Sequence, residues 1–159
     1  MEDELEYIKR LETSKLIEII QDIFGFEETS AALLELYNRD INKTFELGID
    51  ILDNNKGDDY LQATVFDIIY DINPMRTLDC IYKRKADIGV VLLGDIMSEV
   101  SIEIYKKTNI VIPDELLNLL LERYHNLNEY EQNKIIDDYT EFNRNINARS
   151  HSDSVNPSH

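Results

Sequence analysis

The most apolar run of the sequence covers residues 87–100 and reads DIGVVLLGDIMSEV. At 100° per residue, one face of this run is apolar and carries Leu93, Ile96, Met97 and Val100. The pattern predicts a helix with Asp87 as its N-cap. Val90–Leu93 between two glycines is also compatible with a buried strand, but only residues 109–113 offer a second strand-like segment. We therefore predict a central buried helix, in which each glycine costs about 1 kcal/mol relative to alanine unless a neighbouring helix packs closely against it.

A second helical pattern precedes this run at a spacing of 28 residues. Shifting the sequence by that amount aligns residues 59–72 with residues 87–100, and the apolar positions coincide. The acidic positions on the opposite face coincide as well, with Asp67 on Asp95 and Asp71 on Glu99. A period near 30 with helix-length apolar faces is typical of an α-solenoid.

The other apolar positions predict helices separated by short polar breaks. The ranges are residues 2–24, 30–37, 40–52, 74–85, 114–126 and 129–144. Residues 53–59 form a turn-rich acidic loop, and Pro74 suits the first position of the helix that follows Asn73. We predict an all-α fold, a small right-handed stack of antiparallel helix pairs, in one domain over residues 1–145. Residues 146–159 are rich in serine and asparagine without periodicity, which predicts a disordered tail.

The net charge of −16 is concentrated in the N-terminal part of the chain. Residues 1–59 carry 16 acidic and 6 basic side chains, whereas residues 60–112 carry 7 and 6. Such a field repels nucleic acids and anionic membranes and attracts basic surfaces, so we expect neither direct nucleic-acid binding nor membrane binding. The start MEDELE is the opposite of a basic signal-peptide start, and no apolar run approaches the length of a membrane span. These features predict a cytoplasmic protein.

Residues with catalytic or metal-binding chemistry are sparse. The three histidines lack metal-ligand spacing, and Cys80 lies among apolar neighbours, which favours a core position over a nucleophile. The loop at residues 53–59 resembles part of a calcium loop but lacks the required glycine and distal glutamate. We therefore expect no enzyme activity, no cofactor and no bound metal.

The remaining candidate is an acidic surface on the two aligned helices. Asp67 and Asp71 lie one turn apart opposite the apolar face, in the same row as Tyr60. Like charges at this spacing destabilise a helix by about 0.2–0.5 kcal/mol per pair, and the basic residues of this region avoid these rows. A solvated face is the simpler explanation for any single charge, but this segregation favours a partner-binding surface. The candidate residues are Asp53, Asp58, Asp59, Tyr60, Asp67, Asp71, Asp95, Glu99 and Glu103.

The segment DYLQATVFDIIYDINPMRTLDCI at residues 59–81 resembles a HEAT-like repeat, with Leu61 and Ile68 on its first helix and Leu78 and Ile81 on its second. It lacks the arginine usual at the start of the first helix. Size, acidity and helical character also resemble immunity proteins of bacterial contact-dependent inhibition and other polymorphic toxin systems. This resemblance implies a protein that binds one cognate basic toxin domain, such as a nuclease, and blocks its active site. The alternative is an acidic helical adaptor or regulator that binds a basic protein.

Overall fold

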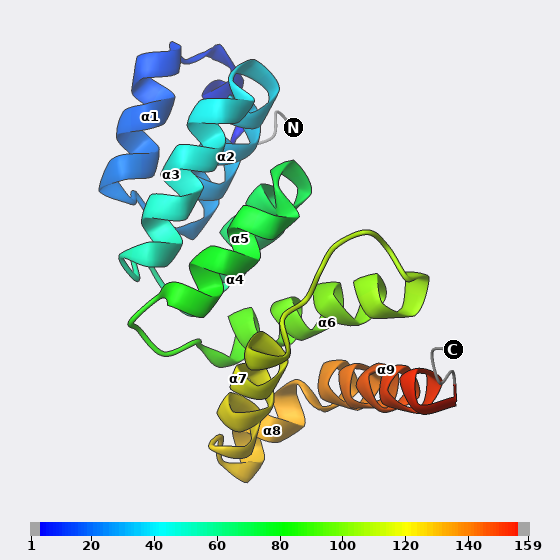
Figure 1. Cartoon of the computed structure of the whole chain (residues 1–159). Coiled ribbons are helices and arrows are strands. Elements are labelled where there is room, and N and C mark those ends of the chain that lie inside the picture. Colours follow the sequence, from blue (N-terminus) through cyan, green and yellow to red (C-terminus); the bar gives the residue numbers. More distant parts are fainter. Residues whose placement is uncertain (1–3, 156–159) are drawn as a thin grey trace. The chain divides into compact units, whose positions relative to one another are not determined.

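The computed structural model describes residues 4–155, and within this range the chain is helical with no β-strand (Figure 1). This confirms the all-α prediction for the described residues. The chain divides into two compact units, unit 1 over Met1–Asp87 and unit 2 over Ile88–His159. The sequence predicts one domain over residues 1–145, whereas the contacts gather into these two units. Each unit is described by itself.

Unit 1 consists of a short 3₁₀ helix followed by five α-helices. Their bounds are η1 Glu6–Arg10, α1 Thr13–Asp22, α2 Phe26–Arg39, α3 Ile41–Asp53, α4 Asp59–Ile72 and α5 Pro74–Lys83. Consecutive helices pack against each other, and α2 also contacts η1 and α4. Pro74 occupies the first turn of α5, as the sequence predicts, and the side chain of Asn73 caps this helix. For residues 2–24 the sequence allows either one continuous helix or a second helix capped by Ser14. The structure has two helices, η1 and α1, but the break lies at the extended residues Leu11 and Glu12, and Ser14 lies inside α1.

The core of unit 1 lies between α2, α3 and α4, where Leu36, Leu52, Phe66 and Ile69 are fully buried. The α3 and α4 backbones approach closely at Gly48, where an added methyl group would overlap the side chain of Ile69. A larger residue at this position would therefore have to displace α4.

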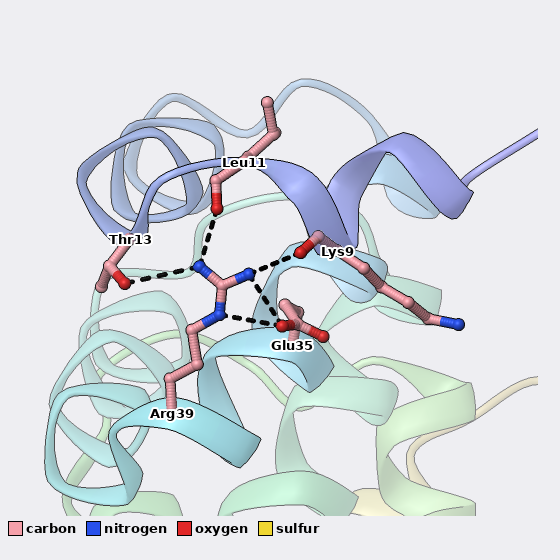
Figure 2. Close-up of polar contacts among 5 residues, drawn as sticks. All are labelled: Lys9, Leu11, Thr13, Glu35 and Arg39. Carbon is pink, nitrogen blue, oxygen red and sulfur yellow. Dashed lines mark hydrogen bonds and ion pairs between the residues drawn. The ribbon is translucent and has the colours of Figure 1, made fainter.

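Hydrogen bonds and an ion pair of Arg39 connect the N-terminal segment of unit 1 to α2 (Figure 2). Its guanidinium donates to the carbonyl oxygens of Lys9 at 2.8 Å and Leu11 at 2.7 Å, and pairs with Glu35 at 2.8 Å. These carbonyls lie at the end of η1, where no further helical turn supplies a donor. The planar fork of the arginine thus closes the end of η1.

Unit 2 is built around α6, Val90–Lys106, which packs against α7, Asp114–His125, α8, Glu129–Lys134, and α9, Ile136–Val155. The apolar run is therefore a buried helix, as expected, but the helices that pack around it are those of unit 2 and not of the whole chain. Gly94 permits a close approach, since an added methyl group would lie 2.8 Å from Cγ2 of Ile135 and 3.0 Å from Oδ2 of Asp138. The close helix packing expected to offset the cost of a glycine within a helix is therefore present at Gly94.

The start of α6 differs from the prediction. Its N-cap is Gly89, which supplies no side-chain bond, and Asp87 lies outside the helix. Ile88 is buried, and its carbonyl oxygen accepts a bond of 2.7 Å from Nε of Arg123. These contacts keep the residues before Val90 extended and move the first turn past Asp87.

The C-terminal segment also differs from the prediction. A single helix over residues 129–144 is expected, but the chain breaks at Ile135, whose side chain is buried against Gly94. The helix that follows, α9, continues through Val155, so residues 146–155 are helical rather than disordered. Phe142 and Asn145 are buried, and Nδ2 of Asn145 donates to Ser101 on α6. Packing on α6 thus stabilises a sequence with weak helical periodicity, and the predicted tail at 156–159 lies outside the described residues.

Among the described residues, none of the helices is both long enough and apolar enough to cross a membrane.

Candidate functional site

The acidic loop between α3 and α4 is organised by Arg84, a buried side chain at the end of α5. Its guanidinium donates to Oε1 of Gln62 at 3.1 Å and to Oδ1 of Asn55 at 3.2 Å. It also donates to the carbonyl oxygens of Ala86 and Asp87, both at 3.1 Å. Nε2 of Gln62 donates to the same oxygen of Asn55 at 2.9 Å. This network ties the loop at residues 53–59 to two helices and fixes its conformation.

Two further contacts hold the ends of this loop. Asp58 is the N-cap of α4, and its Oδ1 accepts the backbone N–H of Leu61 at 2.8 Å. Lys56 pairs with Asp50 at 2.6 Å, and this hydrogen bond lowers the pKa of Asp50 despite partial burial. Asn55 and Gly57 have φ values of 53° and 70°, the left-handed region that asparagine and glycine tolerate best. The loop is therefore a built turn and not a flexible linker.

The predicted acidic residues of unit 1 lie around this loop and along α4. Asp53, Asp58, Asp67 and Asp71 are exposed, and Asp59 is half-buried. Tyr60 is 60% exposed at the start of α4, and its spacing from Asp67 and Asp71 places the three on one stripe of the helix. We call these six residues, Asp53, Asp58, Asp59, Tyr60, Asp67 and Asp71, the acidic surface of unit 1.

Asp71 has a partner that the sequence pattern does not indicate. Its Oδ2 accepts a hydrogen bond of 2.7 Å from the hydroxyl of Tyr37 on α2, and this bond raises the pKa of Tyr37. Part of the role of Asp71 is thus to join α2 to α4.

The three remaining predicted residues, Asp95, Glu99 and Glu103, lie on α6 in unit 2 and are half-buried. Glu103 accepts a hydrogen bond from the hydroxyl of Thr108. Asp95 lies near Asp138 of α9, since its charge contributes to the raised pKa of that carboxyl. The α6 row therefore lies beside other side chains of unit 2 and is less exposed than the row on α4.

Burial is the main cause of the raised pKa of Asp138, followed by the charges of Asp95 and Asp137. Because the pKa of Asp138 is higher in the folded protein than its ordinary value of 3.8, the free energy of unfolding falls as the pH rises from 3.8 to the pKa of the folded state. We expect Asp138→Asn to raise the melting temperature at pH 7 by a small amount, with the gain vanishing below pH 3.8. Thermal unfolding of both proteins across this range measures the difference. Asp137→Asn, at an exposed neighbour, should give a smaller gain, because the charge of Asp137 is a lesser cause of the raised pKa of Asp138 than burial is. An equal gain in melting temperature for Asp138→Asn at pH 7 and below pH 3.8 would contradict the raised pKa of Asp138.

Arg84 gives a second prediction. The guanidinium of Arg84 donates to two side chains and two backbone carbonyls, and the single ammonium group of a lysine cannot make all of these hydrogen bonds. Each hydrogen bond lost to a charged group costs about 1.5–3 kcal/mol. We expect Arg84→Lys to lower the free energy of unfolding by at least about 2 kcal/mol, measured by urea denaturation. Arg76→Lys is the control, because Arg76 is exposed and its guanidinium lies over the Phe45 ring at 4.7 Å, a contact worth about 0.5–1 kcal/mol. Equal losses in the two variants would show that the network does not hold the loop.

Arg84, Asn55 and Gln62 position the acidic loop, but none of them is among the residues that the sequence predicts for the site. Arg84 stands between two lysines and reads as a cation at a helix end. The one indication of this network in the sequence is Gln62, a polar residue between Leu61 and Ala63 at the start of an apolar helix. A buried amide at such a position requires hydrogen-bond partners.

No group of three or more histidine, cysteine, aspartate or glutamate side chains among the described residues is arranged to hold a metal ion. Cys80 is buried, and burial raises the pKa of its thiol to about 11. The thiol is therefore protonated at neutral pH, as expected for a core cysteine.

Comparison of the chain with models of protein families, with curated proteins and with solved structures gives no match.

Proposed function

We propose that this protein is a cytoplasmic immunity protein, which binds one cognate basic toxin domain and blocks it. The toxin domain is a nuclease, and the acidic surface of unit 1 covers its active site. The observation that carries this proposal is a set of carboxylates around a loop that Arg84, Asn55 and Gln62 hold in one conformation. Asp53, Asp67 and Asp71 are exposed there, and Asp53 lies in residues 1–59, the part of the chain with the largest acidic excess.

The physical reason lies in what a nuclease requires. A cleft that holds a phosphate backbone is basic, and it attracts an acidic protein by the same field. Complementary charge raises association rates up to about 10⁸–10⁹ M⁻¹s⁻¹ at low salt. A preformed surface loses little conformational entropy on binding, so more of the interaction energy remains as affinity. Tyr60, exposed beside the carboxylates, supplies an aromatic anchor of the kind found at interface hot spots.

The proposal includes an architecture, a small right-handed HEAT-like stack of helix pairs. It is supported by the packing of consecutive helices in unit 1, where α1 lies against α2 and α3 lies against α4. It is also supported by the aligned positions of the 28-residue register, since Val65 and Leu93 are both fully buried, as are Ile69 and Met97.

Co-expression with the basic domain encoded by the neighbouring gene tests the proposal. The expected result is that this domain stops growth when expressed alone and that growth returns when the protein is present. The purified pair should form a 1:1 complex, and salt should weaken it mainly by slowing association. A neighbour without toxicity, or a toxin that the protein does not neutralise, would overturn the immunity function. Binding of several different basic proteins would instead identify an acidic helical adaptor.

A further inference from the structure

Unit 2 contains a groove between the C-terminal end of α6, the connector at residues 107–113 and α9. Its volume is ≈ 800 Å³, and its apolar lining includes Tyr105, Ile110, Val111 and Ile112. Tyr105 is 75% exposed and Val111 is 68% exposed, although both are large apolar side chains. We call this feature the α6–α9 groove.

The groove also contains cations that lack a carboxylate partner. Among the residues that the structure describes, ion pairs are formed by Lys9, Lys15, Arg39, Lys43, Lys56, Lys83 and Arg144. Lys107 and Arg149 line the groove, yet among the described side chains, residues 4–151, neither has an ion pair or a hydrogen bond. Lys106 lines the adjoining hollow of ≈ 290 Å³, and it too has no ion pair or hydrogen bond among the described side chains, residues 4–151. Arg76, Lys85, Arg123 and Lys134 also form no ion pair among the described residues, so the distinctive feature is that Lys106, Lys107 and Arg149 lie at one place beside apolar side chains.

Simpler causes account for part of this arrangement. Lys106 and Lys107 lie at the C-terminal end of α6, where the helix dipole favours positive charge. Alternation along the extended connector buries Ile112 and turns Val111 outward. Neither cause applies to Arg149, which lies within α9 and reaches the groove from its opposite wall. The dipole and the alternation also do not place Tyr105 beside these residues.

We propose that the α6–α9 groove docks a peptide segment of a partner protein that carries a carboxylate beside an aromatic or branched aliphatic side chain. The apolar side chain occupies the space between Tyr105, Ile110 and Val111. The carboxylate pairs with Arg149 and Lys107, which stand on two walls of the groove. Such charge-assisted bonds gain strength where apolar side chains exclude water.

The charge around the groove favours this occupant over a nucleic acid. Glu103 lines the groove itself, where the Thr108 hydroxyl donates to its carboxylate, and Asp137, Asp138 and Glu141 line the adjoining hollow. These carboxylates would repel a phosphate backbone that extends beyond the cations. A peptide places a single carboxylate next to the cations and apolar atoms elsewhere. This site is independent of the acidic surface of unit 1, which fits partners of the opposite charge.

Selection of a phage-displayed library of random peptides on the full-length protein tests the proposal. The expected peptides contain aspartate or glutamate next to an aromatic or branched aliphatic residue. Synthetic copies should bind Arg149→Glu and Val111→Asp at least about tenfold more weakly, as for loss of an interface hot spot. Lys85→Glu is the matched control, since Lys85 also lacks a carboxylate partner within residues 4–155 but lies in unit 1.

Far-UV circular dichroism checks that both groove variants fold, which is expected because Val111 is exposed and the Arg149 side chain makes no bond to the described side chains of residues 4–151. Failure to enrich any acidic–apolar peptide would overturn the proposal, as would peptides that bind the groove variants as well as the wild type. Enrichment of basic peptides alone would also overturn it, while leaving the proposed function of the acidic surface intact. A variant of the acidic surface of unit 1 that no longer neutralises the toxin but still binds the peptides would show that the α6–α9 groove acts separately from the proposed function.

Discussion

Reversing Asp53, Asp59 and Asp67 to lysine should abolish protection against the toxin domain and weaken its binding by at least about a hundredfold, because each reversal replaces attraction by repulsion at an interface hot spot. The three residues lie around the loop that Arg84 organises and on the α4 stripe. Asp58 and Asp71 are left in place, since Asp58 caps α4 and Asp71 accepts the hydroxyl of Tyr37. Growth rescue and surface plasmon resonance at two salt concentrations measure the effect.

The matched control is the reversal of Glu4, Glu12 and Asp22, three exposed carboxylates in the N-terminal part of unit 1. It changes the net charge by the same amount, so it removes the same share of long-range steering. We expect a slower association rate for the control but continued protection. If both triple variants lose binding equally, net charge alone would account for recognition. If neither does, the acidic surface of unit 1 is not the interface.

Leu93→Ala and Ile96→Ala should each lower the free energy of unfolding by about 2–5 kcal/mol. Both side chains are fully buried on α6, which packs against α7, α8 and α9. Removing their methyl groups leaves a cavity that three surrounding helices would have to collapse to fill. Urea denaturation followed by circular dichroism gives the two values.

Leu5→Ala is the comparison, because Leu5 is only half-buried and precedes the first helix of unit 1. We expect a loss of less than about 1.5 kcal/mol there, since less apolar surface returns to water. Equal losses at all three positions would mean that Leu93 and Ile96 are no more enclosed than Leu5.

Local patterns in the sequence determined the helices and most of their apolar faces. The period of 3.6 residues predicts α4 and the buried face of α6, because a helix packed on one side repeats its apolar residues at that spacing. The caps at Asn73 and Asn128 follow from side chains that bond to the nearest free N–H groups. Exposure of Asp67 and Asp71 also follows, since they lie opposite Val65 and Ile68 on the same helix.

The tertiary structure decided the features that depend on partners distant in the sequence. The late start of α6 depends on Arg123, 35 residues after Ile88, and the helical state of residues 146–155 depends on packing of α9 against α6. Arg84 reads as one of three surface cations until Asn55 and Gln62, 29 and 22 residues earlier, are placed beside it. The groove at Tyr105 and Arg149 likewise joins two helices and a connector. Hydrogen bonds and apolar contacts of this kind depend on distance in space, which periodicity along one helix does not specify.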